Sequence, residues 1–245
     1  MPEDPFEEFA EYYDRMVHEE PERVEFFRTL FEKNGVKSVL DCACGTGGDL
    51  IMVHALGLHV FGSDISEAML TQARKKLSNY QIDIPLACVD FRELPQHFEE
   101  RFDVVLCLTT SLPQLLEERE ILRAIKSMRD VLKPNGILIL TQGLTDEQLA
   151  SRVRFAPAIN DPGFSRIMVV DYYDEEYDVN VLDLIHTQEE SEFKVYSIRY
   201  RILLQDDYER LLRQAGYSQT EYYGDWSFKP YDKRDSELLI VVAHK

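Results

Sequence analysis

Three aspartates, each of which follows a short apolar run, are the side chains of this sequence best suited to binding a charged small molecule. Asp41 ends one such run, and a glycine loop at residues 45–47 comes soon after it. Asp64 and Asp90 follow two further apolar runs. Glycines let the backbone come close to a ligand, and carboxylates accept hydrogen bonds from ammonium or hydroxyl groups. The pattern predicts a site for a nucleotide-like cofactor at the carboxyl ends of three successive strands.

The glycine loop distinguishes between two classes of cofactor. The pattern Gly-x-Gly-x-x-Gly is typical of dinucleotide-binding folds, where the third glycine allows close packing beside a pyrophosphate. Here the pattern starts at Gly45, and Leu50 stands at the third glycine position. An acid such as Asp41 would also lie badly beside a pyrophosphate. Both features count against a nicotinamide cofactor.

The loop and its neighbours resemble motif I of the class I S-adenosylmethionine-dependent methyltransferases. The resemblance implies S-adenosylmethionine as methyl donor, S-adenosylhomocysteine as product, and no metal. It implies that Asp41 attracts the cationic methionine end, that Asp64 accepts hydrogen bonds from both ribose hydroxyls, and that Asp90 binds the adenine amino group. As alternatives, Asp64 could only start a turn and Asp90 could be a solvated loop acid. The expected cofactor-binding residues are Tyr13, Asp41, Ala43, Gly45, Gly47, Asp64, Ile65, Met69, Asp90, Phe91 and Leu108.

Larger parts of the chain resemble glycine N-methyltransferase and related small-molecule N-methyltransferases of amino acids and amino sugars. The segment Gly-Asp-Trp-Ser-Phe-Lys-Pro-Tyr at 224–231 is similar to the Gly-Asp-x-Lys-Pro-Tyr ending of that family. Methyltransferases of amino sugars share the Tyr-Asp pair at 13–14 and an antiparallel insertion. The resemblance is weakest over residues 143–200, where we expect the acceptor to be selected. It covers residues 39–52, 63–70, 102–115 and 206–245.

Two positions depart from the enzymes that methylate glycine. Their arginine for the substrate carboxylate falls on Gly143 here, and their asparagine after the fourth strand falls on Thr110. Arg166 or Arg199 could supply the missing positive charge, or each could be an exposed strand arginine. The substrate-binding residues that we predict are Thr110, Ser111, Arg166 and Tyr200. Further tyrosines that could line the acceptor pocket, or belong to the core, are Tyr172, Tyr173 and Tyr222.

These residues predict a small-molecule methyltransferase whose acceptor is an amine nitrogen, methylated by direct in-line displacement. A neutral amine needs no general base. The candidates are a tyrosine of the insertion and His186, which could also be a structural strand histidine. We expect the acidic, tyrosine-rich run at 171–178 to be a solvated hairpin tip. The alternatives are an O-methyltransferase of a small metabolite and a non-catalytic S-adenosylmethionine-binding protein.

The composition limits the partners that we expect. The 245 residues carry a formal net charge of -18, which repels phosphate backbones and anionic membranes. We therefore expect a small-molecule acceptor and neither nucleic acid nor membrane, while the related enzymes imply a possible homo-oligomer. The acidic beginning of the chain lacks the apolar core of a signal peptide, and the cysteine spacing does not fit a zinc site. These features predict a cytoplasmic protein with reduced, buried thiols.

Strands and helices alternate between residues 36 and 142, which predicts an α/β fold with a parallel sheet. The resemblance implies a Rossmann-like, doubly wound, seven-stranded sheet that is mostly parallel with an antiparallel last strand. Three long strand-like runs without intervening helices then predict an antiparallel β insertion that caps the substrate site. We expect one domain over 1–245: a helical lid at 1–35, a cofactor-binding core at 36–142, the insertion at 143–204, and a helix and strands at 205–245 that complete the sheet.

Overall fold

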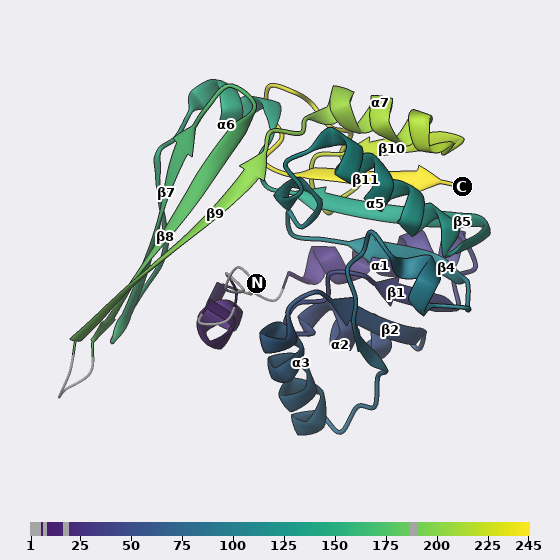
Figure 1. The fold of residues 1–245 in the computed structure, drawn as a ribbon, viewed down its shortest axis with the longest axis horizontal. Helices are drawn as coiled ribbons and strands as arrows, with labels where there is room; N and C mark the ends of the chain where they lie inside the picture. Colours follow the sequence, from purple (N-terminus) through teal and green to yellow (C-terminus); the bar gives the residue numbers. More distant parts are fainter. Residues whose placement is uncertain (1–5, 7–8, 17–19, 187–190) are drawn as a thin grey trace.

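The computed structural model describes residue 6, residues 9–16, residues 20–186 and residues 191–245 (Figure 1). A seven-stranded sheet forms the centre of the molecule, in the order β10-β11-β5-β4-β1-β2-β3. Strand β11 runs antiparallel to both of its neighbours, and the other strands are parallel. The strands are β1 Ser38–Asp41, β2 His59–Asp64, β3 Leu86–Cys88, β4 Phe102–Cys107, β5 Leu132–Gln142, β10 Gln219–Tyr223 and β11 Leu239–His244.

Helices cover both faces of this sheet, because its strands are apolar on both sides (Figure 1). In β4, Val104 and Leu106 point into the apolar cluster under α1, α2 and α3, whereas Val105 and Cys107 point into the cluster under α5 and α7. This two-residue period is the one that a strand dictates. The helices of the two faces are α1 Pro21–Lys33, α2 Gly48–Ala55, α3 Glu67–Asn79, α5 Glu118–Asp130 and α7 Gln205–Ala215.

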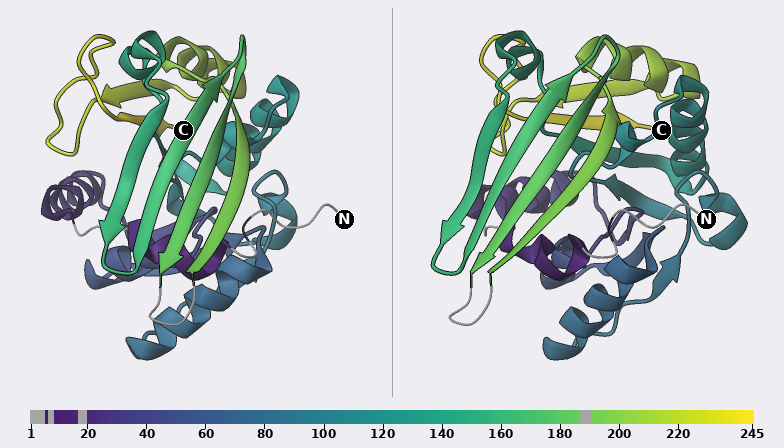
Figure 2. Two further views of the ribbon diagram at one scale, coloured as in Figure 1. Left: turned by 90° about the vertical axis from the view of Figure 1, so that its left-hand side faces the viewer. Right: turned by 60° about the vertical axis from the view of Figure 1, so that its left-hand side comes forward.

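A second sheet of four antiparallel strands, in the order β6-β7-β8-β9, extends away from the core (Figure 2). A short helix, η1 at Phe9–Met16, contacts both α3 of the core and β6 of this sheet. On the other side, β9 contacts the turn η2 at Leu112–Gln114. The four strands are β6 Phe155–Asp161, β7 Phe164–Tyr172, β8 Glu176–His186 and β9 Ser191–Arg201.

The predicted α/β fold is confirmed, including the antiparallel last strand of the main sheet and the separate antiparallel sheet. Sequence patterns missed β6 and the short helices α4 (Leu94–His97) and α6 (Asp146–Ser151). Strand β6 lies at a sheet edge and is mostly exposed, so its sequence has no apolar alternation, and Pro157 interrupts its pairing. The expectation of four buried cysteines was wrong for Cys88, which is exposed on the edge strand β3. None of the described helices is long and apolar enough to span a membrane.

Candidate functional site

A cavity of about 420 Å³ lies at the carboxyl ends of the core strands and is closed on its other side by the antiparallel sheet. The core supplies the loops that follow five strands, β1 to β5, and η1 supplies Tyr13. The core residues that line the cavity are Cys42, Ala43, Gly45, Asp64, Ile65, Met69, Phe91, Thr109, Thr110, Ser111, Gln114, Gly143 and Leu144. Carboxyl ends of strands are where open α/β sheets bind ligands.

Gly47 determines the shape of the glycine loop. It precedes α2 with a φ of 80°, a left-handed conformation that side-chain-bearing residues rarely adopt. A Cβ at this position would also lie 3.2 Å from the Cβ of Ala73. Gly47 itself is not among the residues that line the cavity, but its turn brings Gly45 there.

Asp64 connects the glycine loop to the beginning of α3. Its Oδ2 accepts a hydrogen bond from the backbone N–H of Gly45 at 2.8 Å, and its Oδ1 accepts one from the N–H of Ser66 at 2.9 Å. Ser66 in turn caps α3, since its hydroxyl accepts from the N–H of Met69 at 3.2 Å. The carboxylate is therefore held in one orientation at the cavity wall. An ionised carboxylate has about four acceptor sites, so these two bonds are compatible with binding a diol.

Asp41 lies beneath the glycine loop, only 2% exposed, and does not itself line the cavity. Its Oδ1 accepts a hydrogen bond from the N–H of Ala43 at 3.2 Å. Burial, together with the negative charge of Asp49, holds the pKa of Asp41 well above its ordinary range. Burial and the charges of Asp49 and Asp64 also raise the pKa of Tyr13 to about 12. A positive charge in this part of the cavity would be attracted by the carboxylates of Asp49 and Asp64 and would favour the ionised form of Asp41.

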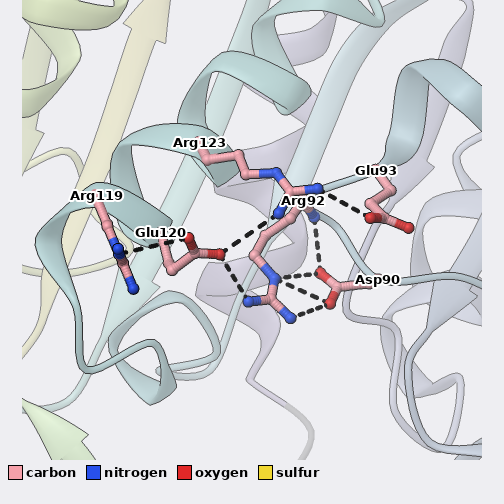
Figure 3. Close-up of polar contacts among 6 residues, drawn as sticks. All are labelled: Asp90, Arg92, Glu93, Arg119, Glu120 and Arg123. Carbon is pink, nitrogen blue, oxygen red and sulfur yellow. Dashed lines mark hydrogen bonds and ion pairs between the residues drawn. The ribbon is translucent and has the colours of Figure 1, made fainter.

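Asp90, which was expected to bind the adenine amino group, forms an ion pair with Arg92. The guanidinium of Arg92 donates to both of its carboxylate oxygens, and the Arg92 N–H donates to Oδ1 at 2.8 Å. Figure 3 shows that this pair continues through Glu120 to Arg123 on α5. Although burial raises the pKa of Asp90, the bonds from Arg92 lower it overall. Asp90 does not line the cavity, whereas its neighbour Phe91 does.

The antiparallel sheet contributes a layered wall. Cross-strand pairing brings Tyr172, Tyr177 and Tyr200 into one row, with ring centroids 6.3 Å and 5.2 Å apart. The next row along the strands is aliphatic, formed by Val170, Val179 and Ile198. The remaining lining residues of this part of the chain are Gln148, Ala156, Met168 and Val181, and Phe6 adds to them from the amino-terminal segment.

Tyr177 corrects a sequence-based expectation, because the run at 171–178 was expected to be solvated. Only the turn at 173–175 joins the two strands, and Tyr177 is 5% exposed. Its alternation with Val179 and Val181 is the signal that could have identified it as a residue of the inward face. Tyr173 is exposed. Tyr222 packs against the apolar cluster under α5 and α7 and does not line the cavity.

Arg166 does not reach the cavity. It is fully buried, and its Nε and Nη2 donate to the two carboxylate oxygens of Asp183 at 2.6 Å each. A third bond runs from Nη1 to the backbone carbonyl of Tyr12 at 3.3 Å. No local pattern indicates this pair, because the partners lie 17 residues apart and meet only through the register of β7 and β8. Arg199 is exposed and forms an ion pair with Asp178 at 2.7 Å.

His186 is also placed away from the cavity. It lies at the exposed end of β8, where its Nδ1 is 3.3 Å from the hydroxyl of Ser191. Leu108 is 2% exposed in the apolar core beneath the site, so it supports the loop without lining the cavity. Of the residues expected to bind substrate, the structure brings Thr110, Ser111 and Tyr200 to the cavity and excludes Arg166.

Thr109 and Thr110 form an unusual turn at the end of β4. Their φ angles are 55° and 63°, in a region that β-branched residues rarely adopt. Bonds to the end of β5 hold the turn: the Thr109 N–H donates to the hydroxyl of Thr141 at 2.8 Å, and the Thr110 N–H donates to its carbonyl at 2.9 Å. Such backbone conformations concentrate at functional sites.

Comparisons with known proteins agree with this geometry. A family model described as a methyltransferase domain matches residues 39–136. Over 255 residues the chain is 28% identical to a glycine/sarcosine N-methyltransferase of Aphanothece halophytica, covering 98% of this chain and 89% of the relative. Its fold matches a crystal structure of an S-adenosylmethionine-dependent methyltransferase from Clostridium acetobutylicum with a TM-score of 0.84 at 18% identity, over 98% and 99% of the two chains. A sugar N-methyltransferase from a Streptoalloteichus species matches with a TM-score of 0.77 at 20% identity, over 97% and 92%.

Proposed function

Because this chain is a class I S-adenosylmethionine-dependent methyltransferase that acts on small molecules and resembles the glycine N-methyltransferases, we propose that it methylates an amine nitrogen of its acceptor. The observation that carries the proposal is the cavity itself. One wall has the glycine loop and the fixed carboxylate of Asp64, and the opposite wall is the aromatic and aliphatic face of the antiparallel sheet. A cofactor and a small acceptor can therefore meet inside it.

The cofactor would occupy the core side of the cavity. Asp64 would accept hydrogen bonds from the two ribose hydroxyls, because its carboxylate is already oriented by two backbone N–H groups. Ile65 and Met69 would pack against adenine, with Phe91 beside the ring. The methionine end would lie near Tyr13 and the buried Asp41, where its sulfonium and ammonium groups would be attracted by Asp49 and Asp64 and would favour the ionised form of Asp41.

Bound S-adenosylmethionine supplies an electrophilic methyl group on its sulfonium, which an amine takes by direct displacement. The proton of the attacking nitrogen would pass to solvent. The residues of this chain contribute alignment and exclusion of water. Burial raises the pKa of Tyr13 to about 12 and the pKa of Tyr200 above its ordinary value, so both hydroxyls stay protonated at neutral pH and orient groups without acting as bases.

We further propose how the parts of the chain divide this work. Residues 1–35 would form a lid, 36–142 the cofactor-binding core, 143–204 a cap over the acceptor, and 205–245 the remainder of the main sheet. The contacts of η1 with α3 and with β6 support this division, because they join the amino-terminal segment to both walls of the cavity.

Asp64→Asn tests the proposal. Replacing the carboxylate by an amide removes charge-assisted bonds worth about 1.5–3 kcal/mol, so the Kd for S-adenosylmethionine should rise about 10- to 150-fold in calorimetry. Asp83→Asn is the matched control, since Asp83 is exposed, does not line the cavity and carries the same charge. An unchanged Kd in Asp64→Asn would contradict the ribose role. S-Adenosylhomocysteine release with alcohols but no amines would contradict N-methylation and favour O-methylation.

A further inference from the structure

The charges around the acceptor side of the cavity are unlike those expected for an amino acid substrate. Among the residues that the structure describes, no lysine or arginine lines the cavity, and Asp64 is the one charged side chain in its wall. The residues outside the described ranges include no lysine or arginine either. On the acceptor side of the cavity, a carboxylate transferred from water would have no cationic side chain in the wall to pair with.

Three basic side chains around the cavity, Arg166, Arg23 and Lys76, are paired with carboxylates. Arg166, which lies on the inward face of the sheet, donates through Nε and Nη2 to the two carboxylate oxygens of Asp183. Arg23 pairs with Asp49 at 2.7 Å, and Lys76 pairs with Asp14 at 2.6 Å. Each of these positive charges is therefore already balanced within the protein.

The small polar side chains of the cavity are also committed to the backbone. The hydroxyl of Thr110 accepts from the N–H of Gly143 at 3.1 Å, and the hydroxyl of Ser111 donates to the carbonyl of Leu108 at 2.8 Å. Gln148 donates through Nε2 to the carbonyl of Glu237 at 3.3 Å. Ser111 would have to give up its existing bond in order to donate to a carboxylate, whereas the hydroxyl proton of Thr110 and the second N–H of Gln148 could still be donated. None of these groups carries a positive charge that would balance a carboxylate.

The wall that faces the core favours an apolar body instead. It consists of the tyrosine row (Tyr172, Tyr177 and Tyr200) and the aliphatic row (Val170, Val179 and Ile198). Apolar surface removed from water in such a wall is stabilising, and tyrosine faces attract a cationic or partly cationic nitrogen.

We infer that the acceptor is an amine with an aromatic or aliphatic body and without a carboxylate. The inference rests on the proposed N-methylation and adds the class of amine. It separates this chain from an enzyme for glycine: a free amino acid would be rejected, whereas the corresponding amine or amino acid ester would be accepted.

One substrate series tests this class. S-Adenosylhomocysteine release is measured with 2-phenylethylamine, phenylalanine methyl ester, phenylalanine and glycine, which vary the carboxylate while three of them share one aromatic body. We expect kcat/KM for the amine and the ester to exceed that for phenylalanine and glycine by on the order of a hundredfold or more, because the acids place an unpaired carboxylate in the cavity.

Gly143 offers a gain-of-function variant. A Cβ at Gly143 has no atom within 4 Å, and its backbone φ is not in the left-handed region, so a longer side chain can extend into the cavity. Gly143→Arg should raise the ratio of phenylalanine to 2-phenylethylamine turnover at least tenfold. Gly143→Met, of similar length and uncharged, should leave that ratio unchanged.

The outcomes separate this inference from the proposed function. Calorimetry with S-adenosylhomocysteine is performed on the same protein, and a lack of binding would contradict the proposed function itself. Binding accompanied by equal turnover of phenylalanine and 2-phenylethylamine, or by a preference for glycine, would overturn the inference alone. Binding without turnover of either 2-phenylethylamine or phenylalanine methyl ester, the two probes that lack a carboxylate, would overturn it as well.

Discussion

The buried pair of Arg166 and Asp183 allows a decisive test of whether Arg166 serves structure or substrate. The variant Arg166→Met removes the guanidinium and keeps an apolar side chain of similar length. Asp183 would then remain fully buried without its ion-pair partner, and the carbonyl of Tyr12 would lose a donor. The expected effect is a large loss of stability with little change in acceptor binding.

The magnitude follows from the burial of the pair. Both side chains have 0% exposure, and removing one partner of such a pair costs about 3–5 kcal/mol. For a chain of this size, each kcal/mol shifts Tm by about 2–4 °C, so Arg166→Met should lower Tm by about 6–20 °C. In contrast, Arg166→Met combined with Asp183→Leu removes both charges and should recover most or all of this loss.

The assay combines thermal unfolding with steady-state kinetics below the lowest Tm. Arg199→Met is the matched control, because Arg199 forms a similar pair with Asp178 on the exposed face of the same sheet. It should shift Tm far less than Arg166→Met. The acceptor KM should stay within about twofold of the parent value in all three variants. An unchanged Tm together with a tenfold higher acceptor KM in Arg166→Met would refute the structural role.

Two further predictions concern Asp41 and Gly62. The pKa of Asp41 is raised by burial, so between its unfolded and folded pKa values the folded protein binds more protons and loses stability as pH rises. Asp41→Asn should therefore unfold at a higher temperature than the parent at neutral pH without cofactor, and the difference should vanish towards pH 4; a constant difference across pH would contradict this. A Cβ on Gly62 would lie 2.6 Å from Leu86 Cδ2 and 2.8 Å from Leu50 Cδ1. Gly62→Ala should thus cost about 1–3 kcal/mol, or about 2–12 °C in Tm, while Gly48→Ala, with its nearest atom at 4.0 Å, should shift Tm little. Equal shifts in these two glycine variants would show that crowding is not the cause.

The α/β core was predictable because its signals are local. Apolar runs that end in acids and the glycine loop each depend on neighbouring residues, and the structure has them at the expected places. Edge elements were less predictable. Strand β6 is held by pairing with β7 and not by an apolar face of its own, so its residues carry no periodic signal.

Individual site residues were predictable where a residue lines the cavity because it lies at or just after the end of a strand. Gly45, Asp64 and Phe91 follow directly from strand ends, and all three line the cavity. The orientation of Asp90 was not predictable in the same way, because either the cavity or Arg92 could have bound its carboxylate. Only the folded chain brings Glu120 of α5 close enough to fix Arg92 beside Asp90.

The sequence by itself determined the fold class and the position of the glycine loop. Its resemblance to motif I also indicated the methyl donor. These properties depend on patterns within about ten residues, which are present in the chain before any tertiary contact forms. Tertiary structure alone decided which charges reach the cavity. Arg166 meets Asp183 across two strands, and Tyr177 joins the row of tyrosines through the same register. Because charge neutralisation depends on which residues pair across strands, the character of the acceptor side emerges only in the folded protein.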